Sequence, residues 1–142
     1  MASIIQVSEA ASLALHSMVL LAASPERSLT VKEITARTEV SEAHLSKVMQ
    51  RLAKAGLVKS THGPKGGFVV GNRGLSTSLL AIFEAIEGPV ANGGCLLQST
   101  ECLFRECLFA GLLSRMTEEF KEYMKNKTLG DMVSCNHEER SA

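Results

Sequence analysis

Residues 30–56 hold two helix signals separated only by a short turn, and this pattern restricts the fold more than any other part of the chain. Thr30 and Glu33 match a capping box, so a short helix should run from there to about Arg37. Ser41 is a favourable N-cap for the next helix. Apolar residues share one face of that helix: Leu45, Val48, Met49 and Leu52. The sequence therefore predicts a helix-turn-helix.

A hairpin is predicted directly after these two helices. Two short runs with β-strand character, Leu57 to Thr61 and Phe68 to Val70, flank the sequence H-G-P-K-G-G. The glycines and the proline of that linker favour a reversal of the chain. Helix, tight turn, helix and hairpin is the order of a winged helix-turn-helix, in which the second helix of the motif enters the major groove of DNA.

Helical spacing also flanks this unit. Apolar residues recurring at three and four positions predict helices over residues 8–23 and 75–87, and a long amphipathic helix from about Thr100 to about Lys127. Five residues form a heptad-like stripe on the long helix: Phe109, Leu113, Met116, Phe120 and Tyr123. A helix of that length is hard to bury within so small a chain. We therefore expect it to pair with its copy in a two-fold dimer, rather than pack on the first helix of a monomer.

The expected fold class is mainly α with a small β-hairpin wing, a winged helix-turn-helix followed by a long dimerisation helix. We expect three regions along the 142 residues. Residues 1–74 would form the DNA-binding domain, and residues 75–129 a helix, a cysteine loop and the dimerisation helix. Residues 130–142 look like a flexible polar tail.

The charge is unevenly distributed, although the formal net charge is zero. Residues 43–83 contain six lysines and arginines and no acid, which indicates a polyanionic partner. His44, Lys47, Arg51 and Lys54 form a stripe opposite the apolar face of their helix. The predicted contacts to double-stranded DNA are Ser41, Glu42, His44, Lys47 and Arg51 on this helix, with His62 and Lys65 on the wing.

Three of the four cysteines, Cys95, Cys102 and Cys107, lie within residues 93–107. No membrane-spanning or leader segment is expected, so we place the chain in the cytoplasm, where thiols stay reduced and a disulfide framework is disfavoured. Clustered thiolates suit an iron-sulfur cluster, zinc or copper(I), and zinc is the weaker choice because paired knuckles are absent. A fourth ligand would have to come from Glu9, Ser12, Glu101, Glu106, a small molecule or a partner subunit. Cys135 is expected to be a free surface thiol.

The chain resembles the IscR/NsrR-type family of bacterial winged-helix transcription regulators over nearly its whole length. Four stretches carry the likeness: S-L-A-L-H-S-M-V-L-L-A (12–22), V-S-E-A-H-L-S-K-V-M-Q-R-L-A-K-A-G-L-V (40–58), H-G-P-K-G-G-F (62–68) and A-I-E-G-P (85–89). The glycine-rich wing after K-A-G-L-V is the most specific of them. The cysteines and the long helix follow in the order that the family has.

The resemblance implies a homodimer that binds a nearly palindromic operator and carries a 2Fe-2S or 4Fe-4S cluster whose state controls DNA affinity. It implies that Cys95, Cys102 and Cys107 are cluster ligands. Ser12 stands at the place of an acidic fourth ligand in some members, with Glu9 one turn earlier, and Ala110 stands where other members have histidine. Many members have arginine where this chain has His62.

The favoured function is therefore a transcriptional repressor controlled by an iron-sulfur cluster that senses iron, redox or nitric oxide status. One alternative is a regulator without a cluster, in which two of the cysteines form a disulfide on oxidation. Another is a small iron-sulfur carrier protein, although that function would not explain the basic helix and wing. An enzyme is not expected, because no nucleophile and base stand at motif spacing.

Overall fold

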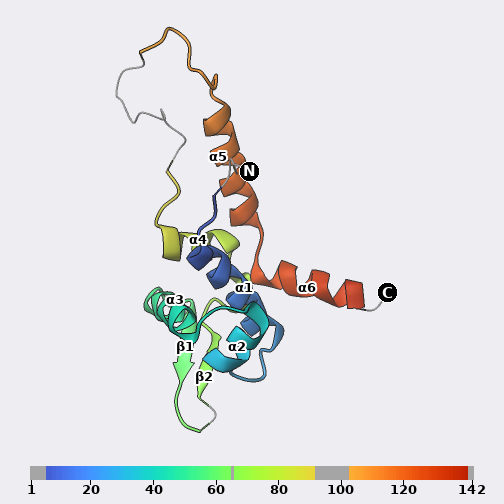
Figure 1. The fold of residues 1–142 in the computed structure, drawn as a ribbon. Coiled ribbons are helices and arrows are strands. Elements are labelled where there is room, and N and C mark those ends of the chain that lie inside the picture. Colours follow the sequence, from blue (N-terminus) through green and yellow to red (C-terminus); the bar gives the residue numbers. More distant parts are fainter. Residues whose placement is uncertain (1–5, 65, 92–102, 141–142) are drawn as a thin grey trace.

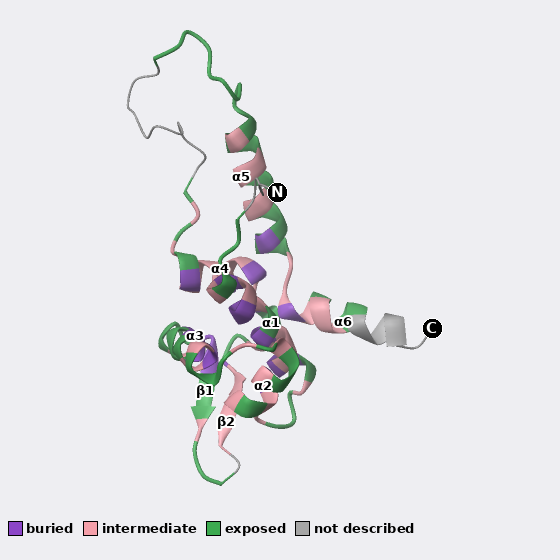
Figure 2. Ribbon diagram, in the orientation of Figure 1, coloured by how far each residue is buried: buried purple, intermediate pink, exposed green. Residues whose placement is uncertain are grey.

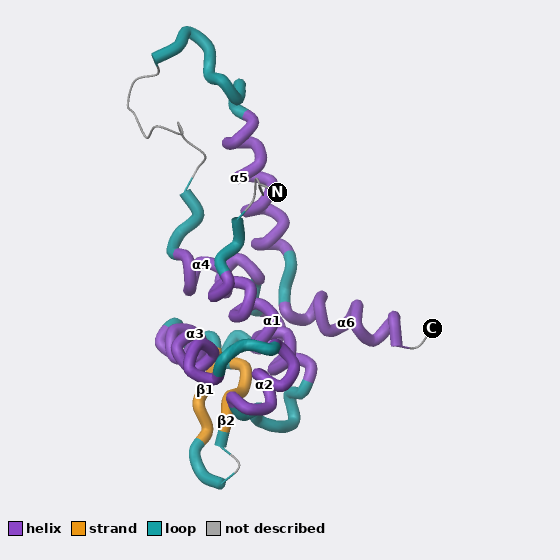
Figure 3. The backbone as a smooth tube through the Cα atoms, viewed as in Figure 1, coloured by secondary structure: helices purple, strands orange, loops and turns teal. Residues whose placement is uncertain are grey.

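The fold is that of a computed structural model, which describes residues 6–64, 66–91 and 103–140, with side chains up to Cys135. Its elements are α1 (Glu9–Ala23), α2 (Val31–Thr38), α3 (Glu42–Lys54), β1 (Val58–Thr61), β2 (Gly67–Val70), the 3-10 turn η1 (Gly74–Ser76), α4 (Leu79–Glu87), α5 (Leu112–Asn126) and α6 (Leu129–Arg140). Helices α1 to α4 and the hairpin form one body, from which α5 and α6 project in different directions (Figures 1 and 3). The mainly α fold with a hairpin wing is confirmed.

Helix α1 is the centre of the core. It packs against α3, α4, α6 and β2. Met18 and Leu21 of α1 are buried together with Leu45, Leu52 and Ile82 from the surrounding helices. Burial is concentrated where these helices meet, while residues 62–64 of the hairpin are exposed and the upper part of α5 has both exposed and half-buried residues (Figure 2). The helix-turn-helix is thus one face of a body built around α1.

The predicted helix caps of this unit are confirmed. The Thr30 hydroxyl accepts from the Glu33 N–H at 3.2 Å, and a carboxylate oxygen of Glu33 accepts from the Thr30 N–H at 2.7 Å. Arg27 bonds the other oxygen of Glu33, and mainly for this reason the pKa of Glu33 falls to about 2. The helix predicted over 75–87 is shorter: residues 74–76 form η1, and α4 starts after Ser78, whose hydroxyl caps it.

The wing is tied to the body through β2. Strands β1 and β2 pair antiparallel, with Val58 opposite Val70. Outside the hairpin, Leu29 exchanges two backbone hydrogen bonds with Phe68, at 3.0 Å and 2.8 Å. A β-carbon on Gly67 would lie 2.4 Å from the Leu29 carbonyl oxygen, closer than any side chain allows. Glycine at position 67 therefore lets the wing pair with the segment between α1 and α2.

Replacing Gly67 with alanine is expected to lower the free energy of unfolding by about 1–3 kcal/mol, because the added methyl group forces β2 away from Leu29. Urea denaturation followed by circular dichroism measures this change. Ser60→Ala, an exposed substitution on β1, serves as the control. Equal stability of Gly67→Ala and wild type would show that the wing does not need this close approach.

The long helix predicted from about Thr100 is wrong over residues 103–111, because α5 begins only at Leu112. Ala110 and Gly111 have left-handed backbone angles, φ 46° and φ 78°, which a right-handed helix cannot include. The Ala110 N–H bonds the Cys107 carbonyl at 2.9 Å and closes a turn. Side chains 103–110 are exposed, so no burial within this chain stabilises a helix there. Thr100 to Cys102 lie outside the described residues.

The segment from residue 130, predicted as a flexible polar tail, forms part of helix α6, which extends from Leu129 to Arg140. Leu129 is fully buried and belongs to the core around α1. Thr128 and Asp131 cap the start of α6 reciprocally: the Thr128 N–H donates to the carboxylate at 2.9 Å, and the Asp131 N–H donates to the hydroxyl at 3.3 Å. The hydrogen bonds that the Thr128 N–H and hydroxyl donate to the carboxylate lower the pKa of Asp131. Burial and a second capping box thus order this segment.

Candidate DNA-binding face and cysteine segment

The polar residues of α3 form two rows. Each residue of an α-helix is turned by about 100° around the helix axis from the one before it. His44 and Arg51 therefore lie in one row along the helix, and Lys47 and Lys54 lie in a second row about 60° farther around the axis. The second row lies farther from the buried face of the helix, which consists of Leu45, Val48, Met49 and Leu52. The single basic stripe expected from the sequence therefore has an inner row and an outer row.

The outer row is free to meet a ligand. Lys47 and Lys54 are exposed, and within the described parts of the chain neither takes part in an ion pair. Gln50 is exposed between them on the same outward face. Gln50 is not among the DNA contacts predicted from the sequence, although the 100° step per residue places it on the same side of the helix as Lys47 and Lys54. Two cations and an amide thus form the outward side of the motif's second helix.

The N-terminal end of α3 is arranged as expected. The Ser41 hydroxyl caps the helix by accepting from the His44 N–H at 3.2 Å. Ser41 and Glu42 are exposed at this end. Helix N-termini in such motifs approach base edges. Ser41 and Glu42 therefore remain predicted DNA contacts.

The residues of the inner row, His44 and Arg51, contact other parts of the protein. His44 Nδ1 lies 3.7 Å from Glu9 Oε1 in the first turn of α1. The guanidinium of Arg51 donates through Nη2 to the backbone carbonyl of Ile86 near the end of α4. Two predicted DNA contacts, His44 and Arg51, therefore have partners within the chain.

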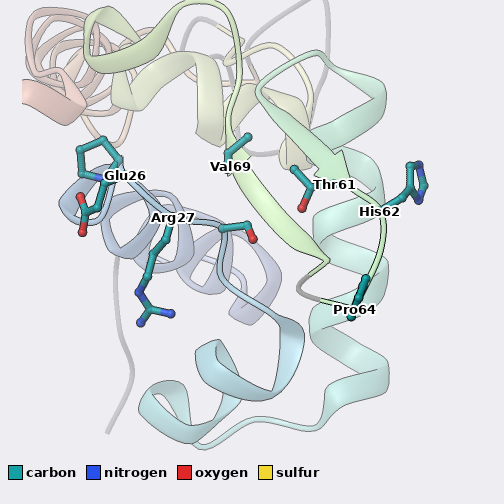
Figure 4. Close-up of a pocket in the computed structure, with 8 residues that line it drawn as sticks. Glu26, Arg27, Thr61, His62, Pro64 and Val69 are labelled. Carbon is teal, nitrogen blue, oxygen red and sulfur yellow. The ribbon is translucent and has the colours of Figure 1, made fainter.

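The wing presents His62 at the end of β1, where its side chain is exposed. A surface hollow of about 490 Å³ separates the wing from the segment after α1, and Arg27 and His62 stand on opposite sides of it (Figure 4). Lys65, the predicted phosphate contact at the tip, lies outside the described residues. The role of His62 in binding DNA stays a prediction.

Cys107 is the predicted cluster ligand that the structure describes, and its thiol is exposed. Backbone N–H groups of Phe109, Gly111 and Ala110, in the turn before α5, lower the pKa of the thiol. The thiolate is the form that binds metals and reacts with oxidants. Cys95 and Cys102 lie outside the described residues. Among the residues that are described, no three His, Cys, Asp or Glu gather in a metal site.

Two of the residues predicted as possible fourth ligands, Glu9 and Ser12, are on α1. Glu9 is largely exposed, with 74% of its side chain accessible, and its carboxylate lies 3.7 Å from His44 Nδ1. Ser12 is half-buried, and its hydroxyl lies 3.5 Å from His16 Nδ1. Neither is brought to Cys107 by a contact among the described residues, so both remain predictions. Cys135 is an exposed free thiol on α6, as expected.

Alkylation by iodoacetamide at neutral pH is expected to modify Cys107 several-fold faster than Cys135, because the backbone N–H groups favour the Cys107 thiolate. Peptide mass spectrometry of reduced, metal-free protein measures both rates in one sample. A Phe109→Pro variant, which removes the N–H that contributes most to the lowered pKa, should slow the reaction of Cys107 and leave Cys135 unchanged. Equal rates in wild type would contradict the prediction.

A capped helix-turn-helix, a β-hairpin beside it and an outward basic row define the class of a winged helix-turn-helix DNA-binding protein. No helix within the described ranges has the length and apolar character needed to cross a bilayer.

Comparison with known proteins gives the same class of DNA-binding protein. The family model of Rrf2, an iron-dependent transcriptional regulator, matches residues 7–135.

Individual relatives point the same way. The chain is 30% identical to the HTH-type transcriptional regulator IscR of Vibrio cholerae over 118 residues, which make up 80% of this chain and 65% of that protein. The structure of CymR, the global cysteine regulator of B. subtilis, has a TM-score of 0.76 and 28% identity, covering 92% of this chain and 98% of that one. T. potens IscR shares the fold, with a TM-score of 0.78 at 24% identity, over 98% of this chain and 93% of that one.

The chain belongs to the Rrf2 family of transcriptional regulators. It is accordingly a DNA-binding regulator and not an enzyme. The likeness to IscR-type proteins that the sequence indicated is confirmed.

Proposed function

We propose that this protein is a homodimeric cytoplasmic repressor whose affinity for an operator is set by the state of Cys95, Cys102 and Cys107. The observation that carries the DNA half of this proposal is the outer row of α3, where Lys47 and Lys54 are exposed beside the wing and form no ion pair with any residue that the structure describes. Phosphate neutralisation by such cations supplies much of the affinity of a protein for DNA. Ser41, Glu42 and Gln50 are placed to read base edges from the same helix.

The cysteine half of the proposal rests on the place of the thiols in the chain. The segment that contains them begins after α4, which packs on α3, and ends at α5. Cys107 stands in the turn directly before α5, where backbone N–H groups favour its thiolate. A change that shortens or releases this segment would act on α4 at one end and on α5 at the other.

The donor set fits an iron-sulfur cluster. Three cysteines within residues 93–107 supply the thiolates that such clusters take, and the N–H groups around Cys107 match the hydrogen bonds that stabilise cluster sulfurs. When bound, the cluster would supply one-electron redox chemistry and sensitivity to oxidants. Cys95, Cys102 and Cys107 would hold it, with Glu9 or Ser12 as candidate fourth ligands. The protein's own contribution is to fix the ligands between α4 and α5.

A dimer is proposed from α5. Its upper part stands away from the body (Figure 1), and Leu112 is 42% exposed. Next to Leu112, Leu113 and Met116 of the apolar stripe are half-buried. At the base, Phe120 packs edge-on against Phe83, with ring centroids 5.1 Å apart. The apolar stripe thus continues past the point where this chain can cover it, which suits a second copy of α5.

Anaerobic purification with absorbance, iron and sulfide assays tests the cluster. Wild type should contain iron and sulfide in equal amounts, and Cys95→Ala, Cys102→Ala and Cys107→Ala should each lose both. Cys135→Ala is the matched control and should behave like wild type. DNA affinity of each protein is then measured by fluorescence anisotropy on duplexes selected from a random library.

A colourless, iron-free wild type that binds DNA and responds to peroxide would replace the cluster with a thiol switch. In that case two thiols lose two protons and two electrons to form a disulfide, and the peroxide is reduced to water. Absence of DNA binding by every form of the protein would contradict the whole proposal.

A further inference from the structure

Arg51 makes a contact that its predicted role does not explain. It lies in the last turn of α3, in the inner row, and its Nη2 donates to the Ile86 carbonyl of α4. The two residues are 35 positions apart in the chain, so this bond fixes one helix against another. A side chain used only for phosphates would have no need of this partner.

The Ile86 carbonyl needs a partner of this kind. Helix α4 ends at Glu87, and its last backbone bond runs from the Gly88 N–H to the Glu84 carbonyl at 2.9 Å. The carbonyls that follow, including that of Ile86, have no N–H one turn later to bond. A guanidinium there supplies both a hydrogen bond and a positive charge at the negative end of the helix. Arg51 therefore acts as a C-terminal cap of α4.

Two further contacts meet at the same junction. The Ser8 hydroxyl, which caps α1, donates to the carboxylate of Glu87. Glu9 lies beside His44, which belongs to the same inner row of α3 as Arg51. The recognition helix α3 is thus held through His44 to the start of α1 and through Arg51 to the end of α4. Beyond that end, the chain continues within five residues into the segment that contains Cys95 and Cys102.

We propose that Arg51 is a positioning residue, which fixes the angle of the recognition helix by capping α4, and not a phosphate contact. This inference rests on the proposed function, since a recognition helix has a role only if the protein binds DNA. The basic residues of α3 would then have two different roles. Lys47 and Lys54 bind the duplex, while Arg51 joins the DNA-binding helix to the helix that leads into the cysteine segment.

Salt dependence separates the two roles, because only a lost phosphate contact changes the slope of log affinity against log salt. Lys47→Ala should lower the slope of the dimer by about 1.8, since about 0.9 is lost for each contact. Arg51→Lys keeps the charge, but its side chain is shorter and ends in an ammonium, so it should hold the Ile86 carbonyl less well than the guanidinium does. This variant should bind roughly tenfold more weakly at every salt concentration, with the slope of wild type. Arg51→Ala should share this lower affinity.

Hydrogen exchange of the DNA-free protein provides a second measurement. The backbone N–H groups within residues 86–91, a stretch in which Pro89 has none, should exchange faster in Arg51→Lys than in wild type and should be unchanged in Lys47→Ala. Thermal unfolding checks that both variants are folded. Wild-type affinity in Arg51→Lys, or unchanged exchange at residues 86–91, would overturn the inference. If wild type binds no duplex, the proposed function fails, whereas faster exchange in Arg51→Lys would still establish the cap.

Discussion

Replacing Lys47 and Lys54 together with alanine is expected to weaken DNA binding roughly a hundredfold and to flatten its salt dependence. Both lysines lie in the outer row of α3, exposed and without ion-pair partners in the described part of the chain. A two-fold dimer would lose four phosphate contacts, each contributing about 0.7 kcal/mol, as exposed charge pairs do. The slope of log affinity against log salt should fall by about 3.6. Fluorescence anisotropy from low to high salt measures both effects.

The matched control removes two charges elsewhere. Lys121→Ala with Lys125→Ala changes the net charge by the same amount on α5, away from the helix-turn-helix. This control should bind within about twofold of wild type. The weakening in the Lys47 and Lys54 variant should be alike for specific and random duplexes, since phosphate contacts do not read sequence. A loss confined to the specific operator would instead place these lysines at base edges.

The elements that could be predicted from the sequence are those that local chemistry determines. The Thr30 and Glu33 capping box, the Ser41 cap and the glycine-rich hairpin each lie within a few residues, and each is confirmed. The same reasoning applied to Thr128 and Asp131 would have predicted α6. Polar composition after Leu129 outweighed this signal, and the helix was missed.

Other features depend on contacts between distant parts of the chain. Arg51 belongs to a basic stripe by spacing, and nothing near it in sequence indicates the Ile86 carbonyl as its partner. The start of α5 depends on left-handed backbone angles at Ala110 and Gly111, and a four-and-three apolar pattern continues through both residues. The spacing of apolar residues predicts which face of a helix is apolar, but it does not indicate whether another part of the chain covers that face.

The sequence predicted more about α3 than about the cysteine segment, the two parts of the candidate site. On α3, spacing identified the helix and its cations. The structure separates the exposed lysines, Lys47 and Lys54, which have no ion-pair partner among the described residues, from His44 and Arg51, which contact the protein. In the cysteine segment, residue type indicated metal or redox chemistry, and the structure adds the thiolate-stabilising turn at Cys107. Cys95, Cys102 and Lys65 lie outside the described residues, so their roles stay predictions.

Replacing Leu113 and Met116 with glutamate is expected to convert the proposed dimer into monomers. Both side chains lie on the apolar stripe of α5, in the part that projects from the body (Figure 1). Burying two carboxylates from each subunit in an apolar interface without partners costs several kcal/mol. Light scattering should give the mass of one 15.2 kDa chain instead of two. DNA affinity should fall more than a hundredfold, because each monomer binds a single half-site.

A single glutamate placed outside the stripe distinguishes this effect from a general effect of charge. Lys125→Glu makes the same two-unit charge change on an exposed part of α5, and this variant should remain dimeric. Circular dichroism should show that the Leu113 and Met116 variant keeps its helices, since the core around Met18 and Leu21 does not include this part of α5. A folded double variant that stays dimeric would move the interface away from α5. The projecting stripe would then need another partner to cover it.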